Sequence, residues 1–282
     1  MKPRREDLIV QLEGLYRRYN HRVYLDTDPV QFVHRFRSPA DRELVGLIAA
    51  HLAYGQVKSI HASIERVLER LGPHPAQRVR EMSLRELQEA MAGFVHRWTR
   101  GEAMARFLFG AGEVCRAHGS LGAAFSRAWA ENPGQSRQAL VAWSCLFRGA
   151  DPKEVGRALM ARPENTSACK RLHLYLRWMV RRDEIDPGPW EGLPLSCLLL
   201  PVDVHMHRIG RWLGFTHRRT ADEKTVVEIT RGFRRLCPED PCRYDFALTR
   251  LGMSGISNRR EMFERLKVQG LFPDPGNLSP DL

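Results

Sequence analysis

The sequence predicts an all-α protein, and three observations support this class. Apolar residues recur at the spacing of helical turns through most of the chain. We find no clear run of strictly alternating apolar and polar residues, so no sheet is expected. The segments between the predicted helices are short, as in a compact helical domain. With 282 residues, 43% of them hydrophobic, the chain can bury a sizeable core.

The first predicted helices come from the N-terminal half of the chain. Residues 1–20 have the pattern of an amphipathic, highly charged helix. Residues 41–72 have apolar positions at helical spacing, and Tyr54 and Gly55 are expected to separate two helices there. Gly72, which a proline follows, suits the end of the second. The same spacing predicts further helices at residues 83–94, 102–119, 121–132, 135–149 and 151–162.

A helix in the segment 168–190 combines an apolar stripe with a line of basic residues. Lys170, His173, Arg177 and Arg181 follow one another at intervals of three or four positions, which places them on one helix face. Mutual repulsion makes such a line costly unless an anion, such as a phosphate backbone, lies on it. The repulsion also favours the neutral form of the Lys170 amine, which is nucleophilic. An ordinary solvated helix face is the alternative interpretation.

The stretch PVDVHMHRIGRWLGF, residues 201–215, predicts a helix that begins at Pro201 and ends at Gly214. Asp203 would lie in the first turn, where free amides and the helix dipole stabilise a carboxylate. A metal-dependent hydrolase using Asp203, His205 and His207 is a weaker alternative. On a helix, His205 would point away from the other two, and no strand is predicted that would align them. We therefore expect no metal.

The remaining C-terminal residues predict one more helix and a tail. Residues 238–257 suit a packing helix that starts at about Arg243, with Asp245 as a helix-start residue rather than a catalytic one. Residues 271–282 have the composition of a loose tail.

Charge and cysteine content limit the class of protein. Lys and Arg total 44 against 33 acidic residues, which gives a formal charge of +11. This balance suits a polyanionic partner, although a solubilising surface would have the same charge. No apolar stretch approaches the roughly 20 residues that span a bilayer, and the N-terminus lacks an apolar signal core. The six cysteines are scattered, so we expect reduced thiols and a cytoplasmic protein.

Two segments resemble the helix-hairpin-helix base-excision DNA glycosylases. LPVDVHMHRIGRWLGF resembles the stretch that carries their catalytic aspartate, approximately Val-Pro-Val-Asp-Thr-His-Val-x-Arg-Val followed by Arg-Leu-Gly. Residues 41–60 are similar to their early helix and DNA-approaching loop, with Gln56 and Lys58 in the loop. More closely, KRLHLYLRWMVRRDEIDPGPW, PVDVHMHRIGRWLG and RYDFALTRLGMSGIS resemble a bacterial family catalogued as a domain of unknown function, over residues from about 10 to about 270.

The resemblance implies a two-lobed helical fold with a central cleft for double-stranded DNA that carries a damaged base. Residues 1–270 would form one unit, with residues 41–162 in one lobe and residues 1–40 and 163–270 in the other. In those enzymes the target base is flipped out, and an aspartate stabilises positive charge on the sugar. Asp203 maps onto that aspartate. Lys170 is the candidate for the lysine that forms a Schiff base in members with AP lyase activity.

The chain departs from the glycosylase pattern at the hairpin. Residues 163–170, PENTSACK, contain no glycine where the family has Leu-Pro-Gly-Val-Gly, and Lys170 lies farther from the aspartate than usual. An archaeal branch of 8-oxoguanine glycosylases has a similar separation, which favours an oxidised purine as the target. A noncatalytic DNA-binding or structure-recognition protein on the same fold is the alternative, since the hairpin is missing.

The sequence also predicts which residues contact DNA, the oligomeric state of the protein and its location in the cell. We expect a nucleoid-associated monomer without a cofactor or an iron–sulfur cluster. Replacing Arg177 and Arg181 together is predicted to weaken DNA binding and flatten its salt dependence. The candidate DNA-binding residues are Gln56, Lys58, Arg171, Arg177, Arg181, His205, Arg208 and Arg211.

Overall fold

The computed structural model describes residues 4–148 and 159–269, and this part of the chain is mostly helical, which confirms the all-α prediction. Short 3₁₀ helices occur at Arg22–Thr27, Leu146–Arg148 and Leu195–Cys197. The α-helices are α1 (Arg5–Tyr19), α2 (Gln31–His34), α3 (Pro39–Leu52), α4 (Val57–Leu71), α5 (Pro75–Glu81), α6 (Leu84–Ala90), α7 (Gly101–His118), α8 (Leu121–Glu131), α9 (Ser136–Cys145), α10 (Lys170–Val180), α11 (Val204–Leu213), α12 (Glu223–Leu236), α13 (Asp245–Met253) and α14 (Arg259–Gln269).

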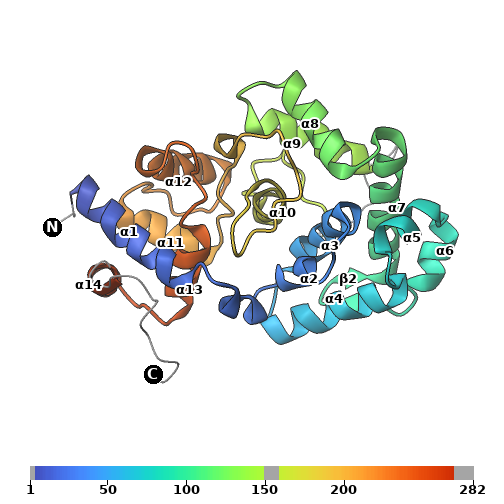
Figure 1. Cartoon of the computed structure of the whole chain (residues 1–282), viewed down its shortest axis with the longest axis horizontal. Helices are drawn as coiled ribbons and strands as arrows, with labels where there is room; N and C mark the ends of the chain where they lie inside the picture. The colour runs from blue at the N-terminus through green and yellow to red at the C-terminus, as the bar shows by residue number, and fades with distance from the viewer. Residues whose placement is uncertain (1–3, 149–158, 270–282) are drawn as a thin grey trace.

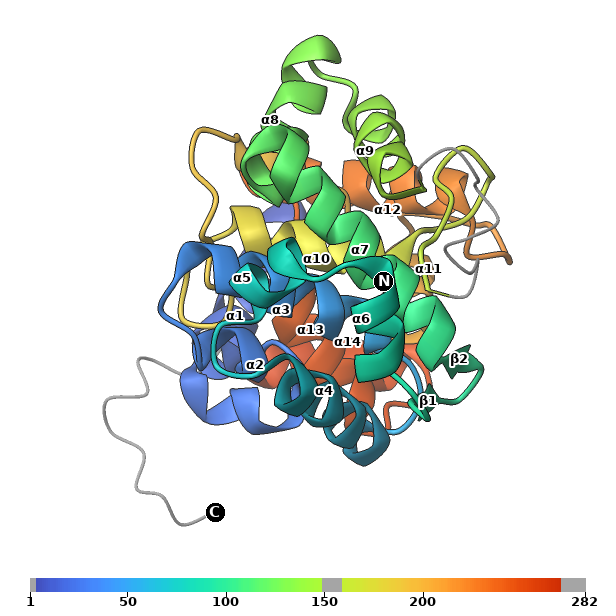
Figure 2. The same cartoon turned by 90° about the vertical axis from the view of Figure 1, so that its right-hand side faces the viewer.

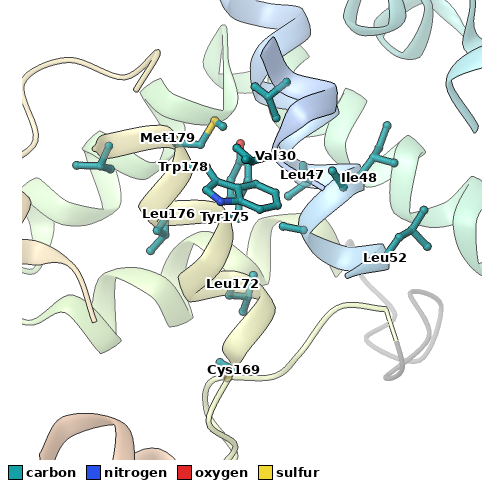
Figure 3. Packing of buried hydrophobic residues seen from close by; sticks show 14 of the residues in the cluster. Val30, Leu47, Ile48, Leu52, Cys169, Leu172, Tyr175, Leu176, Trp178 and Met179 are labelled. Carbon is teal, nitrogen blue, oxygen red and sulfur yellow. The ribbon is translucent and has the colours of Figure 1, made fainter. Parts of the chain in front are cut away.

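Helices α3 and α10 pack against each other at the centre of the molecule (Figure 1). Both are largely buried, and Tyr175 and Trp178 of α10 lie beside Leu47 and Ile48 of α3 (Figure 3). Gly46 permits this approach, because a Cβ atom there would lie 2.6 Å from the terminal methyl carbon of Met179. Burial of these side chains fixes α10, and with it the position of Lys170 at its start.

The other helices surround this central pair. Helices α4 to α7 lie on the α3 side, and α1, α11, α12, α13 and α14 lie on the opposite side (Figure 1). Turned by 90°, the molecule shows α8 and α9 packed side by side above α7 (Figure 2). Helix α1 packs on both α13 and α14, which brings the first and last described helices together. One hydrophobic cluster extends through all these groups.

Most predicted helix positions agree with the structure. The break at Tyr54 and Gly55 is confirmed, because α3 ends at Leu52 and α4 begins at Val57. Gly72 follows α4 with φ 79°, a conformation that glycine adopts readily. The helix predicted for 83–94 is shorter, since α6 ends at Ala90 before a hairpin. Most of the helix predicted for 151–162 lies outside the described residues.

The expectation of no sheet is wrong in one place. Val95–His96 (β1) and Thr99–Arg100 (β2) form an antiparallel pair of two-residue strands. Arg97 at the turn has a left-handed backbone, with φ 53°. Strands this short leave no alternating pattern to detect. Among the described helices, none is both long enough and apolar enough to cross a membrane.

Candidate functional site

The candidate site lies where α10 and α11 begin. Asp203 is the N-cap of α11, and its Oδ1 accepts a hydrogen bond from the backbone N–H of Met206 at 2.8 Å. The helix therefore starts at Val204, one residue after the aspartate. Pro201 and Asp203 precede the first turn, whereas the sequence predicted both within it. The cap holds one carboxylate oxygen and leaves Oδ2 available for another partner.

That partner is Lys170, the first residue of α10. Its Nζ lies 3.5 Å from Asp203 Oδ2, and the two side chains are 35% and 18% exposed. The structure thus brings together the two residues that the sequence singled out for catalysis. The pair is half-buried yet open to solvent, so a ligand can reach both groups.

The turn before Lys170 takes a conformation usually reserved for glycine. Cys169 has φ 44° and ψ 35°, which is the left-handed region. Its backbone N–H donates to Ser167 Oγ at 3.3 Å, and its side chain is buried. The segment 163–170 therefore makes a left-handed entry into α10 although it contains no glycine.

Lys170 and Asp203 lie in the wall of a cavity of about 620 Å³. The opposite walls come from residues 27–29, from the loop between α3 and α4, and from α13. Apolar side chains, among them Ile60, Phe246 and Met253, supply part of the lining. Asp28 lies in the same wall and forms an ion pair with Arg250 at 3.6 Å.

An aromatic stack borders this cavity. Tyr54 lines the cavity and stacks on Trp98, with ring centroids 5.3 Å apart. The guanidinium of Arg171 lies 5.2 Å from the Tyr54 ring centroid and donates to the carbonyl of His51 at 2.9 Å. Arg171 thus supports the cavity wall. Trp98 is 60% exposed at the tip of the hairpin.

The prediction of a cationic face on α10 is wrong beyond the first turn of the helix. Arg177 and Arg181 are only 3% and 4% exposed, and His173 is also buried. Arg177 forms ion pairs with Asp186 and Asp245. These side chains therefore do not form an exposed cationic face, although Arg177 contributes to the wall of the cavity. Arg181 forms ion pairs with Asp183, Asp186 and Asp240.

The carboxylates explain why arginine is tolerated in this interior. Burial alone would lower the pKa of Arg177, but the adjacent Asp186 and Asp245 raise it above its usual range. A buried cation without such partners would be strongly destabilising. Asp245 opens α13, as predicted, and its side chain reaches inward to this ion pair.

The remaining predicted contacts lie on or near the surface. Gln56 and Lys58 are exposed at the start of α4, and Gln56 holds the N-cap position without a side-chain capping bond. His205 lines the cavity beside Asp203. Arg208 and Arg211 lie along the following turns of α11, outside this cavity.

The geometry does not assemble Asp203, His205 and His207 into a metal centre. His207 Nε2 lies 3.0 Å from the carbonyl oxygen of Arg218, away from the aspartate. Within residues 4–148 and 159–269, no group of three or more His, Cys, Asp and Glu side chains is placed to hold a metal ion.

Sequence reasoning missed three features of the site. Tyr54 was identified as a helix break, but its position in the cavity wall was not foreseen. Asp28 belongs to a segment without a recognised motif. The left-handed backbone at Cys169 has no sequence signal, because the residue is not glycine. The placement of Tyr54 beside Gly55 in a loop between two helices was the one sequence feature that pointed to this part of the site.

A family profile described as protein of unknown function (DUF2400) matches residues 28–254, which is more than half of the chain. The chain belongs to this family. The matched span contains Lys170, Asp203 and every described residue of the cavity wall except Thr27, whereas α1 and α14 lie outside it. No curated protein and no solved structure matches the chain.

Proposed function

We propose that this protein is a DNA glycosylase with AP lyase activity that removes a flipped, damaged base from duplex DNA, with an oxidised purine as the favoured target. The observation that carries the proposal is the 3.5 Å contact between Lys170 Nζ and Asp203 Oδ2 in the wall of the 620 Å³ cavity. The likeness of residues 200–215 to the aspartate segment of the helix-hairpin-helix glycosylases agrees with it.

The pair has the groups that this chemistry needs. The Asp203 carboxylate stabilises positive charge on the sugar as the glycosidic bond weakens. Lys170 Nζ gives up a proton to solvent and attacks C1′; the bond from C1′ to the base breaks, and its electron pair leaves with the base, which takes a proton from solvent. The attached nitrogen then loses a proton to solvent and the sugar ring opens: the bond from C1′ to O4′ breaks, O4′ takes a proton, and a protonated Schiff base forms on Nζ. Loss of a C2′ proton expels the 3′ phosphate and cleaves the strand.

The cavity suits an extruded base. Its volume falls within the roughly 300–1,000 Å³ typical of small-molecule sites. Tyr54, Phe246 and Met253 offer aromatic and apolar surface against which a base can pack. The charge of +11 favours association with a polyanion.

Borohydride trapping on damaged duplexes tests the proposal. The panel contains 8-oxoguanine, uracil, an alkylated purine or an abasic site, and the proteins are wild type, Lys170→Ala, Asp203→Asn and Lys267→Ala. Lys267 is exposed on α14 and serves as the matched control. We expect a covalent adduct with wild type and Lys267→Ala, and none with Lys170→Ala.

Base release should fall about 100-fold or more in Asp203→Asn while DNA affinity stays within a few-fold. Full base release by that variant would overturn the proposal. Release that depends on Asp203 but gives no adduct would restrict the activity to a monofunctional glycosylase. Duplex binding without release or adduct on any substrate would instead support a noncatalytic DNA-binding protein.

A further inference from the structure

A second hollow, of about 450 Å³, adjoins the candidate site along α11. We call it the α11 groove. One wall is a single face of the helix, because its lining positions recur at intervals of three and four residues. The segment after Gly214 forms the other wall. The lining residues are Val204, His207, Arg208, Arg211 and Trp212 on the helix and Thr216, His217 and Arg219 opposite.

The α11 groove gathers cationic groups. Among the described residues that line it, none is acidic. Arg211 and Arg219 are exposed, and in the part of the chain that the structure describes neither side chain has an ion pair or a hydrogen bond. Arg218 lies between His217 and Arg219 in the loop and forms an ion pair with Asp222. Asp222 thus neutralises the charge of Arg218, whereas the described residues leave the charges of Arg211 and Arg219 without a counterion.

Arg208 has an unused donor in the same wall. Its Nε is buried and has no hydrogen-bond partner among residues 4–148 and 159–269. The guanidinium lies 5.0 Å from the Trp212 ring centroid, and Nη2 donates to the Gly252 carbonyl at 3.3 Å. Leaving a buried donor unpaired costs free energy, which a bound acceptor would recover.

The walls of the groove are held in place without a ligand. Gly214 caps α11 in the left-handed conformation, with φ 76°, and reverses the chain. The N–H of Phe215 donates to the Gly210 carbonyl at 2.9 Å. His207 Nε2 lies 3.0 Å from the Arg218 carbonyl oxygen, which ties the loop to the helix. A preformed site loses less entropy on binding than a mobile one.

We infer that the α11 groove binds backbone phosphates of the DNA strand whose target nucleotide enters the cavity. This inference rests on the proposed function. Val204 lines both hollows, so the groove leads directly to Asp203. Arg211 lies about two turns, roughly 11 Å, along the helix from the aspartate. Guanidinium groups suit phosphate oxygens because they bind them through two parallel hydrogen bonds.

Two probes and two matched double variants test the inference. The groove variant is Arg211→Gln with Arg219→Gln. The control is Arg85→Gln with Arg260→Gln, whose arginines are exposed on α6 and α14 and are each paired with a glutamate four residues on. The full chain is titrated with sodium pyrophosphate, read by thermal unfolding at constant ionic strength, and with undamaged duplex DNA, read by fluorescence anisotropy at several salt concentrations.

We expect pyrophosphate to raise the Tm of wild type and control but not of the groove variant. The groove variant should bind duplex about tenfold more weakly at low salt. For the groove variant, the slope of the logarithm of the association constant against the logarithm of the salt concentration should be shallower by about 2. Each lost phosphate contact reduces this slope by about 0.9. The control should retain the wild-type slope.

The other outcomes overturn the inference in separable ways. Loss of the pyrophosphate effect with unchanged duplex binding would make the groove a site for a free phosphate compound. Unchanged behaviour with both probes would show that the groove binds neither. If wild type binds no duplex but pyrophosphate still acts through the groove, the proposed function fails along with the backbone assignment, and an anion site of another kind remains.

Discussion

Basic residues spaced along α10 have different roles because their surroundings differ. Lys170 stands at the cavity wall beside Asp203. Arg177 and Arg181, two and three turns farther on, are buried among carboxylates from residues 183–186 and 240–245. Removal of one member of a buried ion pair leaves the other charged and unsolvated. Arg177 and Arg181 are therefore part of the buried ion-pair network and not of an exposed cationic face.

Arg177→Ala should lower the free energy of unfolding by about 3–5 kcal/mol, because Asp186 and Asp245 lose their common partner. Urea denaturation followed by circular dichroism measures the change. Arg85→Ala, at an 87% exposed arginine, should cost less than about 0.5 kcal/mol. Equal effects of the two substitutions would contradict the structural role of Arg177.

Cys169→Val should lower the free energy of unfolding by about 2 kcal/mol, because a β-branched side chain fits poorly at φ 44°. Cys169→Gly should stay within about 1 kcal/mol of wild type, since relief of the left-handed strain offsets the lost side-chain burial. Denaturation curves of the two variants provide the comparison. A valine variant as stable as the glycine variant would argue against a strained turn before Lys170.

At the scale of elements, the sequence is sufficient to predict where most helices lie, but it says little about which distant segments pack against them. Apolar spacing locates α3, α4, α7 and α8, because a helix must bury one face. The Asp203 segment is recognisable, since a cap and its helix are contiguous. Arg177 and Arg181 were mispredicted because the carboxylates that bury them come from segments distant in sequence. The β1–β2 hairpin is too short to show a period.

The two central helices each bury a histidine, and this predicts a pH dependence. Burial lowers the pKa of His51 in α3 to about 3 and that of His173 in α10 to about 4. Between these values and the ordinary pKa of about 6.5, the unfolded chain binds more protons. The contribution of each histidine to stability is therefore fully present above pH 6.5 and is lost as the pH falls, by up to about 1.4 kcal/mol per pH unit.

Urea denaturation at pH 7.5, 6.0 and 5.0 measures this slope. His173→Gln should make the slope shallower, because one of the histidines whose pKa is lowered by burial is gone, while His51, His61 and His96 still contribute. The same slope in wild type and in His173→Gln would show that His173 is protonated inside the fold.

At the scale of the whole molecule, helices outside the family-matched span complete the core. Leu12 and Leu15 of α1 are fully buried, and α1 packs on α13 and α14. Glu13 accepts hydrogen bonds from Arg243 at 2.8 Å and from Tyr244 at 2.5 Å. These contacts hold α1 against α13, which in turn packs on α11 (Figure 1).

Leu12→Ala should lower the free energy of unfolding by about 2–5 kcal/mol, the usual cost of truncating a fully buried leucine. Val10→Ala, two positions earlier on the same helix but 59% exposed, should cost less than about 0.5 kcal/mol. Calorimetric unfolding distinguishes them. Similar melting curves for both variants would mean that α1 is not part of the cooperative core.

The pairing of α1 with α13 and α14 also bears on synthesis. Helix α1 is translated long before Arg243 and Tyr244, so Glu13 lacks these hydrogen-bond donors, and α1 lacks α13 and α14, until those segments have been made. Contacts this distant in sequence form slowly, because a large loop must close. The apolar face of α1 thus stays uncovered until α13 and α14 have been made, and α1 can dock only after that point.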